Sequence, residues 1–217
     1  MAIMGLFCGL GTGYFLCIII SKISAQVINS EVIDKNNNSI QMKKQESNDA
    51  VAIKPILVII ISGIIFSISF FKFGFNVSLI QALALNCILV VVSFIDIEHQ
   101  IIPDKLVTVT LAIGFICLFI NDISFINAIG GMALGGGLLL LLALVPGVLG
   151  GGDIKLMFAL GVFLGGKGVL VAIFISFAIA SIISILLLIL KIKKRKDYIP
   201  FGPFLSIGTY IAFHLLI

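Results

Sequence analysis

Charged residues are scarce in this 217-residue chain, and tryptophan is absent from it. Only 11% of the residues are Asp, Glu, Lys or Arg, whereas 60% are hydrophobic. Soluble domains carry about a quarter charged residues and roughly half apolar ones. A water-soluble core cannot bury this excess of apolar side chains, but a lipid bilayer can. The composition therefore predicts an all-α, polytopic membrane protein.

Cysteine pairs with the spacing of a zinc or redox motif are also lacking. The four cysteines all lie in apolar segments, and no two of them form a C-x-x-C pair. Neither a disulfide framework nor a zinc site is indicated, so we interpret the thiols as small buried hydrophobes. The net charge of +4 is modest. It bears on membrane topology and gives no indication of nucleic-acid binding.

Apolar runs recur along most of the chain, and a membrane span needs about 20 predominantly apolar residues. We expect about eight transmembrane helices, with six or seven as alternatives, because single Gly or Lys residues set several borders. The runs cover residues 2–20, 55–72, 77–95, 105–121, 124–147, 154–170, 171–190 and 200–217. Lys22 follows the first run, which is the reverse of the charge order in a cleaved signal peptide. We therefore expect an uncleaved first helix with its N-terminus outside.

The positions of the basic residues support this topology. When eight helices are threaded from an outside N-terminus, all Lys and Arg residues except Lys72 and Lys167 fall on the cytoplasmic side. Cytoplasmic loops of membrane proteins carry an excess of Lys and Arg. The opposite orientation would invert this distribution.

Three parts follow from the pattern of apolar and polar residues. Residues 1–20 form the first transmembrane helix, residues 21–54 a short, loosely ordered cytoplasmic loop, and residues 55–217 a membrane-embedded core. Within the core, Gly131 and Gly135 have the small-xxx-small spacing that lets helix backbones approach closely. We interpret this spacing as structural.

Four acidic residues lie at the expected cytoplasmic ends of spans: Asp96, Glu98, Asp104 and Asp153. Asp96 ends an apolar run, where the helix dipole and the adjacent hydrocarbon both disfavour a negative charge. That setting suits a carboxylic acid that holds or exchanges a proton. An interfacial aspartate that simply reaches water is an equal alternative on this reasoning.

Asp153 follows three glycines, Gly150 to Gly152, and precedes a predicted helix. Helix capping explains an aspartate there, yet a glycine loop also lets an extended substrate approach the backbone. Asp104 follows Pro103, where capping is again the simpler interpretation. If Asp96 and Asp153 share a site, one carboxyl stays protonated while the other activates water. That is the chemistry of aspartic proteolysis.

Three ordered segments resemble those of the type IV prepilin peptidases, also called prepilin leader peptidases. The first is Phe94 to Leu106, the second is the G-x-G-D-x-K motif of residues 150–155, and the third is Ile199 to Phe204. The resemblance implies an aspartic endopeptidase of the bacterial cytoplasmic (inner) membrane. It implies cleavage of the short basic leader of type IV prepilins and pseudopilins at the cytoplasmic face.

Carried over residue by residue, the resemblance makes Asp96 and Asp153 the catalytic pair. Residues that match the motifs and would bind substrate or support the site are Gly150, Gly152, Lys155, Asp104, Phe201, Gly202 and Pro203. The implied partners are prepilin or pseudopilin substrates and the lipid bilayer. The peptidase activity would need no metal and no cofactor.

One departure from the family concerns the first cytoplasmic loop. Many bacterial members carry paired cysteines there and also N-methylate the new N-terminus, but Ser21 to Lys54 contains no cysteine. A zinc site in this loop is therefore excluded, and methyl transfer is in doubt. S-adenosylmethionine is implied only if that second activity is present.

Three other classes of protein compete with the peptidase. Intramembrane carboxylates mark ion- or proton-coupled transporters, although these usually bind near the bilayer midplane between inverted repeats. A presenilin-like protease resembles the chain at residues 150–153, but its Pro-Ala-Leu signature is missing. In a non-catalytic membrane scaffold the aspartates would only cap helices.

Overall fold

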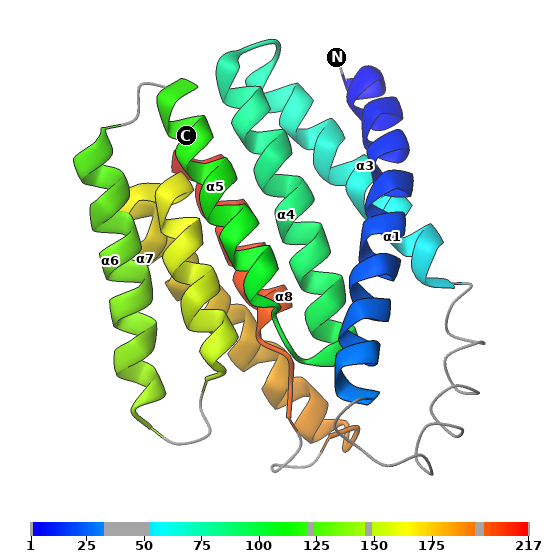
Figure 1. The fold of residues 1–217 in the computed structure, drawn as a ribbon, viewed down its shortest axis with the longest axis vertical. Coiled ribbons are helices and arrows are strands. Elements are labelled where there is room, and N and C mark those ends of the chain that lie inside the picture. Colours follow the sequence, from blue (N-terminus) through cyan, green and yellow to red (C-terminus); the bar gives the residue numbers. More distant parts are fainter. Residues whose placement is uncertain (1, 33–52, 121–123, 146–148, 194–197, 217) are drawn as a thin grey trace. The chain divides into compact units, whose positions relative to one another are not determined.

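The computed structural model describes residues 2–32, 53–120, 124–145, 149–193 and 198–216. Every regular element within these ranges is an α-helix (Figure 1). The chain divides into two compact units, residues 1–79 and residues 80–217. The expectation of an all-α chain is confirmed.

The first unit contains α1 (Ala2–Val32) and α3 (Ile53–Phe73). Small residues bring the two helices together: a Cβ built on Gly9 would lie 2.8 Å from the Gly63 Cα. Ser62 adds a hydrogen bond, since its hydroxyl donates to the Gly9 carbonyl at 3.0 Å. α1 continues beyond residue 20, so the polar stretch expected as a loop begins on a helix. Most of that stretch, residues 33–52, lies outside the described residues.

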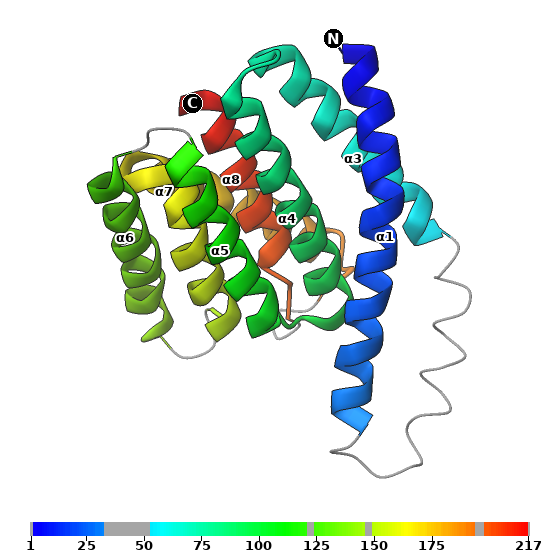
Figure 2. The ribbon, with the colours of Figure 1, turned by 45° about the horizontal axis from the view of Figure 1, so that its top comes forward.

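The second unit holds the remaining helices. They are α4 (Val77–His99, with its first three residues in the first unit), α5 (Asp104–Ile120), α6 (Phe125–Ala143), α7 (Gly151–Ile189) and α8 (Gly202–Leu216). α7 packs against α5, α6 and α8, and Figures 1 and 2 show α6 beside it at the edge of this unit. The first half of α7 is the most deeply buried segment, with Leu156, Met157 and Leu160 fully enclosed. This buried segment carries the second aspartate motif at its N-terminus.

Glycines set the close contact between α6 and α7. A Cβ on Gly131 would meet the Gly161 carbonyl oxygen, and one on Gly135 would lie 2.8 Å from the Met157 carbonyl oxygen. Both atoms belong to backbone that cannot rotate away. The close helix approach predicted from the spacing of these two glycines is therefore confirmed.

α7 is interrupted at Gly165, whose backbone is left-handed (φ 64°, ψ 179°). The chain reverses there, so the two segments of α7 run in different directions in Figure 1. The Asn127 side chain on α6 accepts a hydrogen bond from the Gly166 amide at 3.1 Å, which satisfies a free N–H where the second segment starts. Our sequence-based border, between residues 170 and 171, lies several residues beyond the break.

Five described helices are long and apolar enough to cross a membrane: α1, α3, α4, α6 and α7. α8 is a shorter apolar helix. A straight helix of 39 residues would be about 60 Å long, roughly twice the hydrocarbon thickness of a bilayer. The interruption at Gly165 divides that length. The expected total of about eight spans is not confirmed by this measure.

Candidate active site

The last turn of α4 positions the first aspartate. Asp96 is 3% exposed, and its backbone carbonyl accepts a hydrogen bond from the Gln100 amide at 2.9 Å. Gln100 has a left-handed backbone (φ 55°), which ends α4 and turns the chain towards α5. The location of Asp96 near a helix C-terminus, inferred from the apolar run before it, is confirmed.

The start of α7 positions the second aspartate. α7 begins at Gly151, after the extended N-cap residue Gly150 (φ −79°, ψ 147°). Asp153 is therefore the third residue of the helix and does not occupy the N-cap itself. Its carboxylate reaches back and accepts a hydrogen bond from the Gly150 amide, as an acidic residue at this position does in a capping box. Its Oδ1 atom is buried and has no hydrogen-bond partner.

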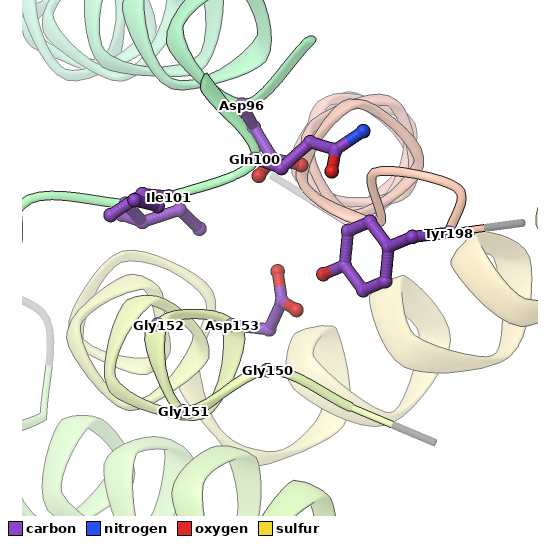
Figure 3. Close-up of a pocket in the computed structure, with 9 residues that line it drawn as sticks. Asp96, Gln100, Ile101, Gly150, Gly151, Gly152, Asp153 and Tyr198 are labelled. Carbon is purple, nitrogen blue, oxygen red and sulfur yellow. The ribbon is translucent and has the colours of Figure 1, made fainter. Parts of the chain in front are cut away.

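Both aspartates line one cavity of about 230 Å³ (Figure 3). The carboxylates enter it from opposite sides, one from α4 and one from α7. The other lining residues are Gln100, Ile101, Ile102, Gly150, Gly151, Gly152 and Tyr198. Two sequence motifs that are far apart in the chain thus meet at one end of the second unit.

The electrostatics of this cavity are those of two acids close to each other. Asp153 is 3% exposed, as Asp96 is, and the charge on Asp96 acts on Asp153. Two buried carboxylates that share a site cannot both ionise cheaply, so the pair holds one proton between them. The arrangement can therefore supply a base and an acid at the same point.

Gly202, at the start of α8, fixes the Asp96 carboxylate. Its amide donates a hydrogen bond to Asp96 Oδ2 at 2.7 Å. A Cβ on Gly202 would lie 2.9 Å from the Asp96 Cβ, so there is no room for a side chain. Pro203 occupies the first turn of α8. Backbone N–H groups there have no hydrogen-bond partner within the helix, so the N–H that proline lacks does not weaken the helix. The Phe201 ring packs on Phe177 with centroids 5.0 Å apart.

Lys155 and Asp104 form an ion pair beside the cavity, with Nζ 2.7 Å from Oδ1. It joins the second turn of α7 to the first turn of α5, and neither side chain lines the cavity. Gly152 contributes by close packing, because a Cβ there would lie 3.0 Å from the Ile102 Cβ. These residues brace the loop that follows Asp96 against the helix that carries Asp153.

Tyr198 is a lining residue that sequence reasoning missed and that lies outside all three motifs. It precedes the third motif and presents its phenol to the cavity (Figure 3). Burial raises the pKa of this phenol, and the charges on Asp153 and then Asp96 raise it further. Four further lining residues were also missed, although they lie inside the first two motifs: Gln100, Ile101, Ile102 and Gly151. The only indication in the sequence was that they lie between residues that the motifs had assigned to the site.

Metal-ligating side chains do not gather around the aspartates. In the part of the chain that the structure describes, no group of three or more His, Cys, Asp or Glu residues could hold a metal ion. The donors to the two carboxylates are backbone amides.

The fold and this site define a multi-pass helical membrane protein with a buried aspartate pair. Residues 83–185 match the type IV leader peptidase family. Three similar proteins are each named prepilin leader peptidase/N-methyltransferase. The one from Xanthomonas campestris is 32% identical over 178 residues, 79% of this chain and 62% of the relative. The Legionella pneumophila protein is 36% identical over 147 residues, 64% of this chain and 51% of the relative.

A third relative, from Neisseria gonorrhoeae, is 29% identical over 172 residues, 75% of this chain and 58% of the relative. The chain thus spans between about half and three fifths of the length of these relatives. No solved structure gives a significant match. Over residues 83–185 the chain is thus similar to the type IV leader peptidase family, in agreement with the resemblance of its three motifs.

Proposed function

We propose that this chain is an aspartic endopeptidase that removes the short basic leader of type IV prepilins or pseudopilins. The site would act at the cytoplasmic face of the bacterial inner membrane. The observation that carries the proposal is the meeting of Asp96 and Asp153, from separate motifs, in one cavity. Similarity to the type IV leader peptidase family favours this activity over a transporter or a scaffold.

The proposed reaction needs only water and the two carboxyl groups. The ionised aspartate takes a proton from a water molecule held between the pair, and the resulting hydroxide attacks the scissile carbonyl carbon. The protonated aspartate gives its proton to the carbonyl oxygen. When the tetrahedral intermediate collapses, the C–N bond breaks and the leaving amine takes up a proton. One water is consumed for each peptide bond cleaved, and no covalent enzyme intermediate forms.

The surroundings of the pair suit a peptide substrate. Gly150 and Gly151 line the cavity without side chains, so a substrate backbone can approach the carboxylates. Ile101, which is 46% exposed, provides an apolar edge beside them. A prepilin presents a polar leader followed by an apolar helix, and a site at one end of a helical bundle matches that boundary.

Methyl transfer is the second activity named for the relatives, and S-adenosylmethionine would be its methyl donor. The aspartate cavity of about 230 Å³ is smaller than the roughly 300–1,000 Å³ of ordinary small-molecule sites. The residues described around it do not fit this cofactor beside a peptide. We therefore assign no step of methyl transfer to these residues.

The deciding experiment is cleavage of a prepilin by membranes that contain the full chain. Wild type is compared with Asp96→Asn and Asp153→Asn, which keep side-chain size and remove the acid. We expect cleavage by wild type and a loss of at least about a thousandfold in each variant, because either substitution removes half of the acid–base pair. Cleavage that survived both substitutions would rule out the aspartic mechanism. Mass spectrometry of the new N-terminus reports methylation in the same samples.

A further inference from the structure

Tyr198 lies in the segment between α7 and α8 and reaches into the aspartate cavity. Its hydroxyl points towards the Asp153 carboxylate (Figure 3). A Cβ built on Gly150 would lie 3.2 Å from Asp153 Oδ2 and 3.6 Å from the Tyr198 hydroxyl oxygen. The carboxylate and the phenol therefore converge on the same stretch of backbone.

The phenol is a hydrogen-bond donor over the whole neutral range. Its pKa is raised by burial first, next by the charge on Asp153 and then by the charge on Asp96. The larger effect of Asp153 agrees with the orientation in Figure 3. Asp153 Oδ1 is a buried acceptor without a partner, and an unpaired carboxylate oxygen of this kind is costly to leave so.

The two aspartates differ in the donors available to them. Each accepts one backbone amide, from Gly202 for Asp96 and from Gly150 for Asp153. Only Asp153 also faces a phenol among the residues that line the described cavity. A donor stabilises the ionised form of a carboxylate.

We propose that Tyr198 is a positioning residue that donates a hydrogen bond to the Asp153 carboxylate and so holds this catalytic group in place inside the cavity. The inference rests on the proposed peptidase activity and deepens it by naming a residue that orients one of the two aspartates. Tyr198 acts through Asp153 and forms no bond with the substrate.

Among the residues of the second unit that the structure describes, few other charged groups bear on this inference. Asp96 on α4 acts on both Asp153 and Tyr198. Lys155 on α7 pairs with Asp104 on α5. Lys193 donates a long hydrogen bond, 3.5 Å, to the Tyr198 backbone carbonyl. Further groups near this end of the unit are Lys105, Glu98 and His99; the Glu98 Oε2 and His99 Nε2 atoms lie 4.0 Å apart. Helix α6 has no charged side chain, and the only titratable side chain of this kind on α8 is that of His214.

The first test is the pH dependence of prepilin cleavage by the full chain. Tyr198→Phe removes the hydroxyl and keeps the ring, whereas Tyr198→Leu removes both. Without its donor, Asp153 takes up a proton more readily, so the acid limb of the kcat/KM profile should move to higher pH by about one unit in both variants. Tyr14→Phe, on an exposed position of α1, is the matched control and should leave the profile unchanged. A Tyr198→Phe profile that coincides with wild type would overturn the proposal, as would a shift in Tyr198→Leu alone.

The second test does not depend on cleavage. The chain has three tyrosines and no tryptophan, so phenolate absorbance can be followed without interference, and the difference from Tyr198→Phe isolates one phenol. Asp153→Asn should lower the pKa of Tyr198 by about one unit, and Asp96→Asn should lower it less. If Asp153→Asn leaves the titration of Tyr198 unchanged, the coupling is absent and the proposal fails. This result stands whether or not the chain proves to be a prepilin peptidase.

Discussion

Gly202→Ala offers the sharpest structural test of the proposed site. The added methyl carbon would lie 2.7 Å from Asp96 Oδ2 and 2.9 Å from both the Cβ and the Cγ of Asp96. Carbon atoms in contact are ordinarily about 3.5–4.0 Å apart, so the side chain must retreat by roughly 0.6 Å or more. Rotation of the carboxylate does not relieve the contact, because the Asp96 Cβ is itself too close. The amide donor is kept, so the substitution changes geometry alone.

The expected loss of activity follows from that displacement. Misplacing a reacting group by about 1 Å can cost about a hundredfold in rate. We expect Gly202→Ala to lower kcat by roughly 10- to 100-fold, or about 1.4–2.7 kcal/mol of transition-state stabilisation. Overpacking should also lower the free energy of unfolding by about 1–3 kcal/mol. Initial rates of prepilin cleavage in detergent measure the first effect, and thermal unfolding of the same preparation measures the second.

Gly137→Ala is the matched control, because a Cβ on Gly137 meets nothing within 4 Å. It should fold and cleave as wild type does. A folded Gly202→Ala protein with a wild-type cleavage rate would refute the role that we give to this contact. That result would show that Asp96 acts from a position other than the one it takes beside α8.

Three further results are expected. Gly131→Ala should destabilise the protein by about 2 kcal/mol or more in thermal unfolding, because its Cβ would meet backbone of α7; Gly130→Ala, which has open space, should not. Asp104→Asn should change the free energy of unfolding by less than about 1 kcal/mol, because its ion pair with Lys155 is exposed; a larger loss would mean that the pair braces the site more strongly than its exposure suggests. Cleavage should survive EDTA, because the residues described near the aspartates include no metal-binding group; inhibition that is reversed by added metal would contradict the two-carboxylate mechanism.

The elements of this protein were largely predictable because composition and local pattern determine them. Long apolar runs predicted helices, and the spacing of Gly131 and Gly135 predicted the close approach of α6 to α7. The location of Asp96 at the end of a span also follows from local sequence. In each case the signal lies within one segment of the chain.

The interruption of α7 shows where local reasoning failed. The apolar run continues through Gly165, Gly166 and Gly168, so hydropathy placed the border at residue 170. The left-handed backbone of Gly165 and the cap from Asn127 determine the actual break. A cluster of glycines was visible in the sequence, but which one would take a positive φ depends on the contact with α6.

The surroundings of the two aspartates could not be predicted for a related reason. Gly202 and Tyr198 reach them only because α7 returns the chain to the end of the unit where α4 finishes. No periodicity within a single helix encodes that meeting. The family resemblance selected Gly202 but not Tyr198, because its third segment, as we read it, starts one residue later, at Ile199.

The choice of donors in this cavity fits the chemistry that we propose. A lysine or arginine beside the pair would hold both aspartates ionised and leave no acid. The described cavity is lined by no cation, and the adjacent Lys155 is engaged by Asp104 outside it. Backbone amides at the starts of α7 and α8 take that place. They carry only the partial positive charge of a helix N-terminus, which orients each carboxylate and still lets one proton remain on the pair.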